Sequence, residues 1–209
     1  FPGVFKTGQW VGNPLRQAFT QQATPAERFA GRSGPLRVLV VGGSLGAKAL
    51  NDIVPQALAL MPQATRPTVI HQSGAKQIDA LRANYEAAGV QAELTPFIDD
   101  TASAFAQVDL VICRAGASTV TELAAVGVAA VFVPFPFAVD DHQTTNAQFL
   151  VASGGGWLVP QAELTAQNLA ERLTALSRDT LQDVAQKAHA QKKTNATREV
   201  VMACEELAA

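Results

Sequence analysis

The residues best suited to bind a ligand lie in the stretch from Asp109 to Ala147. Leu110–Cys113 is a short apolar run that ends in a glycine turn, a pattern typical of a buried parallel strand. A helical pattern begins at Ala117 and stops at Gly127, which is a typical helix-ending glycine. The helix therefore begins just beyond the carboxyl end of a strand, where open α/β sheets bind their ligands.

The start of this helix is suited to an anion. The backbone N–H groups of Ala117, Ser118 and Thr119 have no partner within the helix, and the helix dipole adds to their attraction for a phosphate. Glu122 lies one turn after Ser118 on the same helix face. Its carboxylate is well placed to accept hydrogen bonds from two vicinal hydroxyls, as on a ribose. The alternative is an ordinary surface glutamate on a packing helix.

A glycine-rich stretch after the strand expected at residues 36–41 predicts a second ligand loop. Gly42, Gly43 and Gly46 surround Ser44 in the sequence GGSLGA, and a helical pattern follows. The glycines let the backbone approach a ligand, and the start of the following helix can hold an anion. The stretch is not a Walker loop, because no Gly-Lys-Ser/Thr ends it, and it matches the dinucleotide fingerprint only loosely.

Three polar residues at other strand ends have two interpretations each. His71 ends the strand expected at residues 68–71; it is either a base or a histidine that is hydrogen-bonded locally, and we favour the second. Asp99 and Asp100 suggest a metal site, but adjacent aspartates point in different directions and no other ligand cluster accompanies them. We therefore expect Asp100 to cap the helix at 101–107, and we predict no metal site.

Four motifs, in order, resemble the C-terminal half of the MurG family of peptidoglycan glycosyltransferases. The motifs are GNPLR, GGSLGA, FIDD, and CRAGASTVTELAAVG with its continuation VPFP and DHQTTNA. The resemblance runs from about Val11 to about Ala196, and four ordered motifs are far more specific than any one of them. Members of this family move N-acetylglucosamine from UDP-GlcNAc to lipid I.

The resemblance implies a role in donor binding for each motif. Arg16 would contact the diphosphate or the adjacent sugar, the Ser44 hydroxyl would meet the donor phosphate, and the backbone at Ile98 would pair with the uracil. His142 and Gln143 would reach hydroxyls of the transferred sugar. Gln143 is the stronger candidate of the two, because one amide can donate to one hydroxyl and accept from another.

The resemblance also implies what this sequence lacks. The transfer to lipid-linked MurNAc-pentapeptide would proceed with inversion and without a metal or cofactor, and the catalytic general base would come from an N-terminal half. That half would also bind lipid I and contact the cytoplasmic face of the bacterial inner membrane as a peripheral protein. The chain opens at Phe1 without an initiator methionine, so we expect a soluble fragment that binds donor and turns nothing over.

Composition limits the other classes of protein. The 209 residues are 48% apolar and 16% charged, which fits a globular α/β protein. The net charge is −2 and no basic run stands out, so nucleic acid is not an expected partner. Cys113 and Cys204 form neither a disulfide framework nor a metal-binding spacing, which fits a reducing compartment. No apolar run reaches the length of a membrane span, and we expect no signal peptide.

Strand and helix patterns alternate along the chain, which predicts a Rossmann-like, doubly wound, mostly parallel sheet. By resemblance it is one half of a glycosyltransferase B fold. We expect residues 1–10 to be an interdomain linker, residues 10–14 to hold a short strand, and residues 11–209 to form one UDP-sugar-binding domain with closing C-terminal helices.

Several other functions are compatible with the same architecture. They are a UDP-sugar epimerase, half of another glycosyltransferase, a nicotinamide-dependent oxidoreductase domain, and a non-catalytic nucleotide-binding module. The oxidoreductase would need an acidic residue after a strand about twenty residues past GGSLGA, and residues 63–69 do not supply one convincingly.

Overall fold

The computed structural model describes residues 8–43 and 46–208. Within them, six strands form one sheet in the order β3-β2-β1-β4-β5-β6, and every neighbouring pair is parallel. The strands are β1 (Arg37–Val41), β2 (Thr68–Gln72), β3 (Glu93–Thr95), β4 (Leu110–Cys113), β5 (Ala129–Phe132) and β6 (Trp157–Leu158). The predicted doubly wound α/β fold is confirmed.

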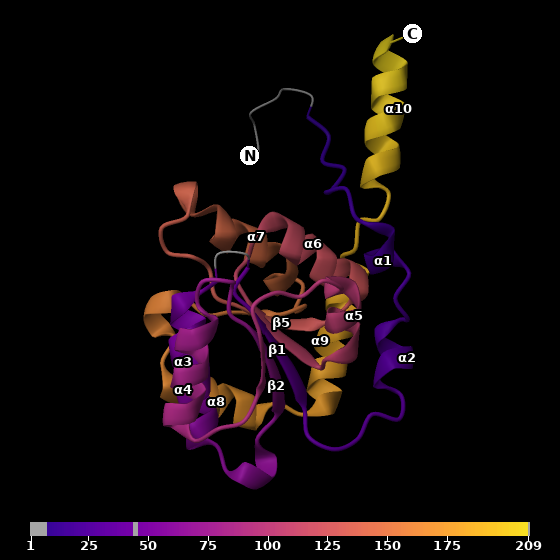
Figure 1. Ribbon diagram of the computed structural model, residues 1–209. Coiled ribbons are helices and arrows are strands. Elements are labelled where there is room, and N and C mark those ends of the chain that lie inside the picture. Colours follow the sequence, from indigo (N-terminus) through magenta and orange to yellow (C-terminus); the bar gives the residue numbers. More distant parts are fainter. Residues whose placement is uncertain (1–7, 44–45, 209) are drawn as a thin grey trace.

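Helices cover both faces of the sheet. Figure 1 shows α3, α4 and α8 on one side and α5 and α6 on the other, while α9 packs against α2 and α6. The helices are α1 (Gln17–Thr20), α2 (Pro25–Phe29), α3 (Lys48–Leu60), α4 (Ile78–Ala88), α5 (Thr101–Gln107), α6 (Ala117–Val126), α7 (His142–Val151), α8 (Ala166–Ala175), α9 (Arg178–Ala190) and α10 (Ala196–Ala208), with 3-10 turns at Gln63–Thr65, Val139–Asp141 and Gln161–Glu163. No helix in this described part of the chain is long and apolar enough to cross a bilayer.

The central strands are apolar at every position because both faces of the sheet are covered. Successive side chains still point to opposite faces, as the pleat requires. Val40 and Ile112 pack into the core on the α3 side, whereas their neighbours Leu39 and Val111 pack into the core on the α6 side. The sheet therefore lies between two cores, which leaves the ends of the central strands and the loops there accessible to a ligand.

Capping residues set several of the described helix boundaries. The Thr24 hydroxyl accepts from the Glu27 N–H, and the Glu27 carboxylate accepts from the Thr24 N–H at 2.8 Å, so the predicted capping box is present. Asp100 caps α5, as predicted, and Gly89 and Gly127 close α4 and α6.

The expected strand at residues 10–14 is wrong, because these residues have no regular secondary structure. Gly12 has a φ of 92°, which no strand allows, and Pro14 has no N–H to give to a ladder. The segment is held by side chains instead. Trp10 packs edge-on against Phe149 of α7 with ring centroids 5.4 Å apart, and Asn13 donates to the Thr121 hydroxyl of α6 at 3.1 Å.

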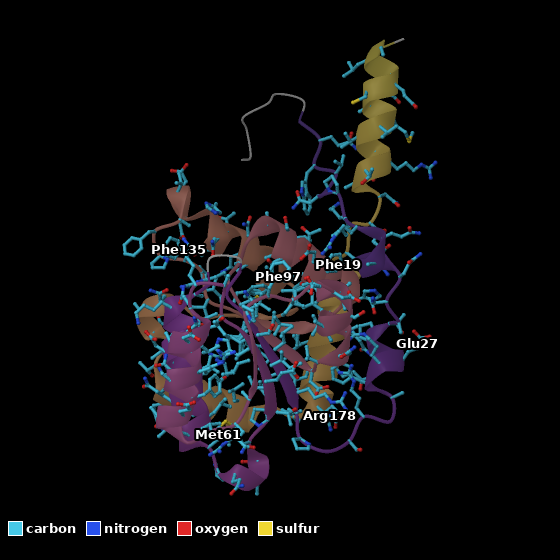
Figure 2. All side chains as sticks on the ribbon, in the orientation of Figure 1. Phe19, Glu27, Met61, Phe97, Phe135 and Arg178 are labelled. Atoms are coloured by element: carbon cyan, nitrogen blue, oxygen red, sulfur yellow. The ribbon has the colours of Figure 1, made fainter. Side chains whose placement is uncertain are left out.

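A buried carboxylate fastens the N-terminal helices to the end of the sheet where the strands begin. Asp109, with no exposed side-chain surface, accepts from Arg32 at 2.7 Å, from the Arg37 backbone N–H at 2.9 Å and from Arg178 at 3.4 Å. Arg178 is labelled at this end of the molecule in Figure 2. These bonds join the segment before β1 to the start of α9.

Candidate functional site

The loops after β1, β3, β4 and β5 meet at the carboxyl edge of the sheet. Figure 2 labels Phe97 and Phe135 at this edge, with Met61 and Arg178 at the opposite end. A cavity of about 720 Å³, here called the large cavity, opens among these loops. Its lining includes the glycines Gly42, Gly43 and Gly46, and also Arg114, Gly116, Thr119, Phe135, Gln143 and Gln161.

The glycine loop after β1 needs a glycine at its end. Gly46 has a φ of 76°, and its N–H donates to the Gly43 carbonyl at 3.0 Å. A Cβ on Gly46 would lie 2.1 Å from the Ser73 carbonyl oxygen, far inside contact distance. The loop therefore lies directly against the end of β2. Ser44, predicted to meet a phosphate, lies outside the described residues.

The start of α6 faces the same cavity. Gly116 occupies the N-cap position and no side chain caps the helix, so its first N–H groups face outward. Thr119 lines the large cavity, and Ser118 is exposed. Ala117 lines a different cavity of about 220 Å³ beside Trp10. The predicted helix start is confirmed; the binding roles of its residues stay predictions.

A second cavity of about 170 Å³, here called the small cavity, adjoins the large one. Val41, Gly43 and Thr119 line both cavities. The small cavity also brings Ile98 and Glu122 together, and their roles at the base and the ribose stay predictions. Its remaining lining residues are Gln72, Phe97, Thr101 and Phe105. The two cavities thus form one continuous surface from the glycine loop to the loop after β3.

Glu122 is half-buried in the wall of the small cavity. Burial raises the pKa of its carboxyl, and the Arg16 guanidinium acts in the opposite direction. Arg16 itself is exposed and lies over the Phe19 ring at 5.0 Å, outside the lining of either cavity. Its charge therefore acts on Glu122 in this structure, and its contact with a diphosphate or sugar stays a prediction.

Gln143 lines the large cavity, whereas His142 is exposed and does not. The Gln143 side-chain oxygen accepts from the N–H groups of Phe135 at 3.0 Å and Ala115 at 3.2 Å. The group that this side chain can offer a ligand is therefore its NH₂, a donor. The His142 Nδ1–H donates to the Val139 carbonyl at 2.8 Å within the 3-10 turn.

His71 is a buried structural residue, as predicted. Its Nε2 lies 3.0 Å from the Asn51 side-chain oxygen and its Nδ1 lies 3.0 Å from the Tyr85 hydroxyl. The Asn51 NH₂ group donates to the Ser73 carbonyl, so Nε2 carries the proton and Nδ1 accepts. Burial lowers the pKa of His71 to about 3, and both ring nitrogens are engaged, which leaves none for a ligand.

Sequence reasoning missed Arg114. Its guanidinium donates to the Val133 and Pro134 carbonyls at 2.9 and 3.0 Å and to the Gln161 side chain at 2.6 Å. Arg114 thus connects the end of β4 to the loop after β5 by hydrogen bonds, and it also lines the large cavity. Burial lowers the pKa of this guanidinium. The signal in the sequence was an arginine directly before the glycine turn that ends a buried strand.

Residues 8–43 and 46–208 contain no cluster of three or more His, Cys, Asp or Glu side chains that could hold a metal ion. Cys113 is buried in β4, where burial raises the pKa of its thiol to about 12, and Cys204 is exposed on α10. Neither cysteine lines the large or the small cavity. The polar groups lining the two cavities include amides, the Thr119 hydroxyl, the charged side chains of Lys48, Asp52 and Arg114, and the Glu122 carboxylate.

Known sequences now identify the family. Residues 37–201 match the Glycosyltransferase family 28 C-terminal domain. The chain is 70% identical over 209 residues to the UDP-N-acetylglucosamine--N-acetylmuramyl-(pentapeptide) pyrophosphoryl-undecaprenol N-acetylglucosamine transferase of Paracidovorax citrulli, and it covers 59% of that protein. The transferase of the same name from Azoarcus sp. is 62% identical over 208 residues, and the chain covers 58% of it. The chain thus spans somewhat over half the length of these curated relatives.

Solved structures agree with the sequences. The crystal structure of Acinetobacter baumannii MurG matches 99% of this chain and 58% of its own, with a TM-score of 0.87 and 40% identity. The UDP-GlcNAc 2-epimerase from Neisseria meningitidis bound to UDP-GlcNAc matches with a TM-score of 0.57 and 13% identity, which shows a shared fold alone. The resemblance predicted from four ordered motifs is confirmed. The chain belongs to glycosyltransferase family 28 and carries the C-terminal domain of that family.

Proposed function

We propose that this chain is the UDP-GlcNAc-binding half of an inverting transferase that moves N-acetylglucosamine to undecaprenyl-pyrophosphoryl-MurNAc-pentapeptide, lipid I. The names of the relatives at 70% and 62% identity support this activity for a longer protein. The observation that carries the proposal is the pair of adjoining cavities that share Gly43 and Thr119. One has the glycine loop and the uncapped start of α6, and the other has Glu122 and Ile98.

The parts of UDP-GlcNAc can be assigned one after another along the two cavities. The diphosphate lies at the start of α6 and on the glycine loop with Ser44, where backbone N–H groups and the helix dipole favour negative charge. The uracil lies at Ile98 and the ribose hydroxyls bond to Glu122, in the small cavity. The transferred sugar lies in the large cavity, where the Gln143 NH₂ group donates to a hydroxyl.

Catalysis by this half is electrostatic. As the bond between the sugar and the diphosphate breaks, negative charge grows on the departing UDP. The start of α6 is fixed before the reaction begins, so its N–H groups stabilise that charge without reorganising. No proton transfer is assigned to the residues described, because the general base belongs to the half that this chain does not contain.

The N-terminal half, which carries the general base, also supplies the acceptor site and a peripheral contact with the cytoplasmic face of the bacterial inner membrane. Residues 1–10 are the linker to it. The C-terminal helix α10 supports a partner of this kind, because it extends away from the sheet (Figure 1) and leaves Val200, Val201, Met202 and Leu207 exposed.

The ribose contact is tested by comparing UDP with 2′-deoxy-UDP in the native chain and in Glu122→Gln. A hydrogen bond to a charged group contributes about 1.5–3 kcal/mol, so native affinity for UDP should exceed that for the deoxy ligand by at least roughly tenfold. Glu122→Gln should remove most of that difference. Glu171→Gln, on the exposed face of α8, is the matched control. Equal losses for both ligands in Glu122→Gln would place the ribose elsewhere.

A further inference from the structure

Gln72 closes β2 at the carboxyl edge and is only 3% exposed. Its side-chain NH₂ group donates to the Gly43 carbonyl at 3.1 Å and to the Pro96 carbonyl at 3.0 Å. Gly43 belongs to the glycine loop after β1, and Pro96 belongs to the loop after β3 that carries Phe97 and Ile98. Because β2 lies between β1 and β3, one amide joins the loops on its two sides.

The orientation of this amide is settled by its partners. Both are carbonyl oxygens, so the NH₂ group must face them, and the Gln72 oxygen faces away. That oxygen is buried and has no hydrogen-bond partner among the described residues. A buried acceptor without a partner lowers the stability of a fold, and an apolar side chain of the same shape avoids this cost. Stability alone therefore does not explain a glutamine here.

The two carbonyls lie in loops at the surface. Gly43 and Pro96 are both exposed residues, so we expect water to replace the amide at their oxygens when Gln72 is substituted. The Gly43 oxygen also accepts from the Gly46 N–H at 3.0 Å, so the turn of the glycine loop and the bond to Gln72 meet at one atom. What the amide adds is a fixed spacing between the two loops.

We propose that Gln72 is a positioning residue that holds the diphosphate loop and the nucleobase loop at the separation a nucleoside diphosphate requires. This inference rests on the proposed function, which assigns those two ligand parts to the two loops. Gln72 and Gly43 both line the small cavity, and Gly43 lines the large cavity as well. A ligand that bridges both loops gains from a spacing fixed in advance, whereas a ligand that meets one loop does not.

The test compares one bridging ligand with its two parts. Affinities for UDP, uridine and inorganic pyrophosphate, with ADP as the test of base preference, are measured by calorimetry and NMR titration for the native chain, Gln72→Met and the control Gln167→Met. Gln167 is an exposed glutamine on α8 that donates to Glu171. Gln72→Met should bind UDP about tenfold more weakly, equivalent to about 1.4 kcal/mol, and should bind uridine and pyrophosphate within about threefold of the native chain. Its melting temperature should equal or exceed the native value, whereas a merely structural Gln72 would lower it.

Gln72→Asn provides the second variant in case Gln72→Met does not fold. Its amide is one carbon shorter and cannot reach both carbonyls, so the same loss confined to UDP is expected. Unchanged affinity for UDP, or equal losses for UDP and uridine, would overturn the positioning role while leaving the proposed function in place. A native chain that does not prefer UDP to ADP would overturn the proposed function, and the role of Gln72 with it.

Discussion

Replacing Gly46 by alanine tests the closest approach in the binding loop. The φ of 76° places the residue in the left-handed region, which costs a non-glycine residue roughly 1–2 kcal/mol. The new Cβ would also lie 2.1 Å from the Ser73 carbonyl oxygen, and real contacts of this kind are not shorter than 3.0 Å. Ser73 is completely buried at the end of β2, so the glycine loop has to move instead.

The expected loss combines both effects. Overpacking adds about 1–3 kcal/mol to the backbone strain, so Gly46→Ala should lower the free energy of unfolding by roughly 2–5 kcal/mol. Gly89→Ala is the matched control, because Gly89 has a φ of 63°, no atom within 4 Å of its added Cβ, and a position at the end of α4 outside both cavities. It should lose only the roughly 1–2 kcal/mol of strain.

Urea denaturation measures the two unfolding free energies, and calorimetry measures the affinity for UDP. The displaced loop should weaken UDP binding at least roughly tenfold in Gly46→Ala and leave it unchanged in Gly89→Ala. If Gly46→Ala were no less stable than Gly89→Ala and bound UDP like the native chain, the fixed contact between the loop and β2 would be refuted.

Three further outcomes are expected. Asp109→Asn should lower the free energy of unfolding by about 3–5 kcal/mol in urea, because it leaves the charges of Arg32 and Arg178 without their buried partner, and it should not change UDP affinity. Stability should fall as the pH drops from 6.5 toward about 3, because in that window the unfolded chain binds a proton at His71 that the folded chain excludes. Urea titrations at several pH values in this window give the free energy of unfolding as a function of pH. This free energy should depend less steeply on pH in His71→Phe than in the native chain, and an equal dependence would contradict a neutral, buried histidine. Incubation of the chain with UDP-GlcNAc and lipid I should give no lipid II by radiolabel transfer, and turnover would show that the general base lies within these residues.

Local signals predicted the secondary structure well. The boundaries of α5, β4 and α6 follow from residues that act on their own neighbours: the Asp100 cap, the glycine turn after Cys113 and the terminating Gly127. The strand expected at residues 10–14 is wrong because Gly12 has a positive φ and Trp10 packs against Phe149 of α7 rather than into the sheet. That contact joins positions far apart in sequence, and no local pattern reports it.

The candidate site was also predicted in part, because some of its features follow from local patterns and others from contacts between distant segments. Glu122, Ile98 and Thr119 were predicted to share a ligand, and they line one cavity because parallel strands bring their carboxyl ends to one edge. Gln72 was not predicted, because its role depends on the order β3-β2-β1, which places it between two loops. The donor-only character of Gln143 also escaped prediction, because its oxygen is engaged by N–H groups that follow two other strands.

Calorimetric titration of this chain with UDP-GlcNAc, UDP, ADP and NAD, without added metal, shows whether this edge of the sheet binds a UDP-sugar. We expect binding of both uridine ligands, weaker or absent binding of ADP and NAD, and a clear loss of UDP-GlcNAc affinity in Glu122→Ala. Preference for ADP or NAD, or uridine binding that Glu122→Ala does not weaken, would contradict the assignment of this edge of the sheet to a UDP-sugar.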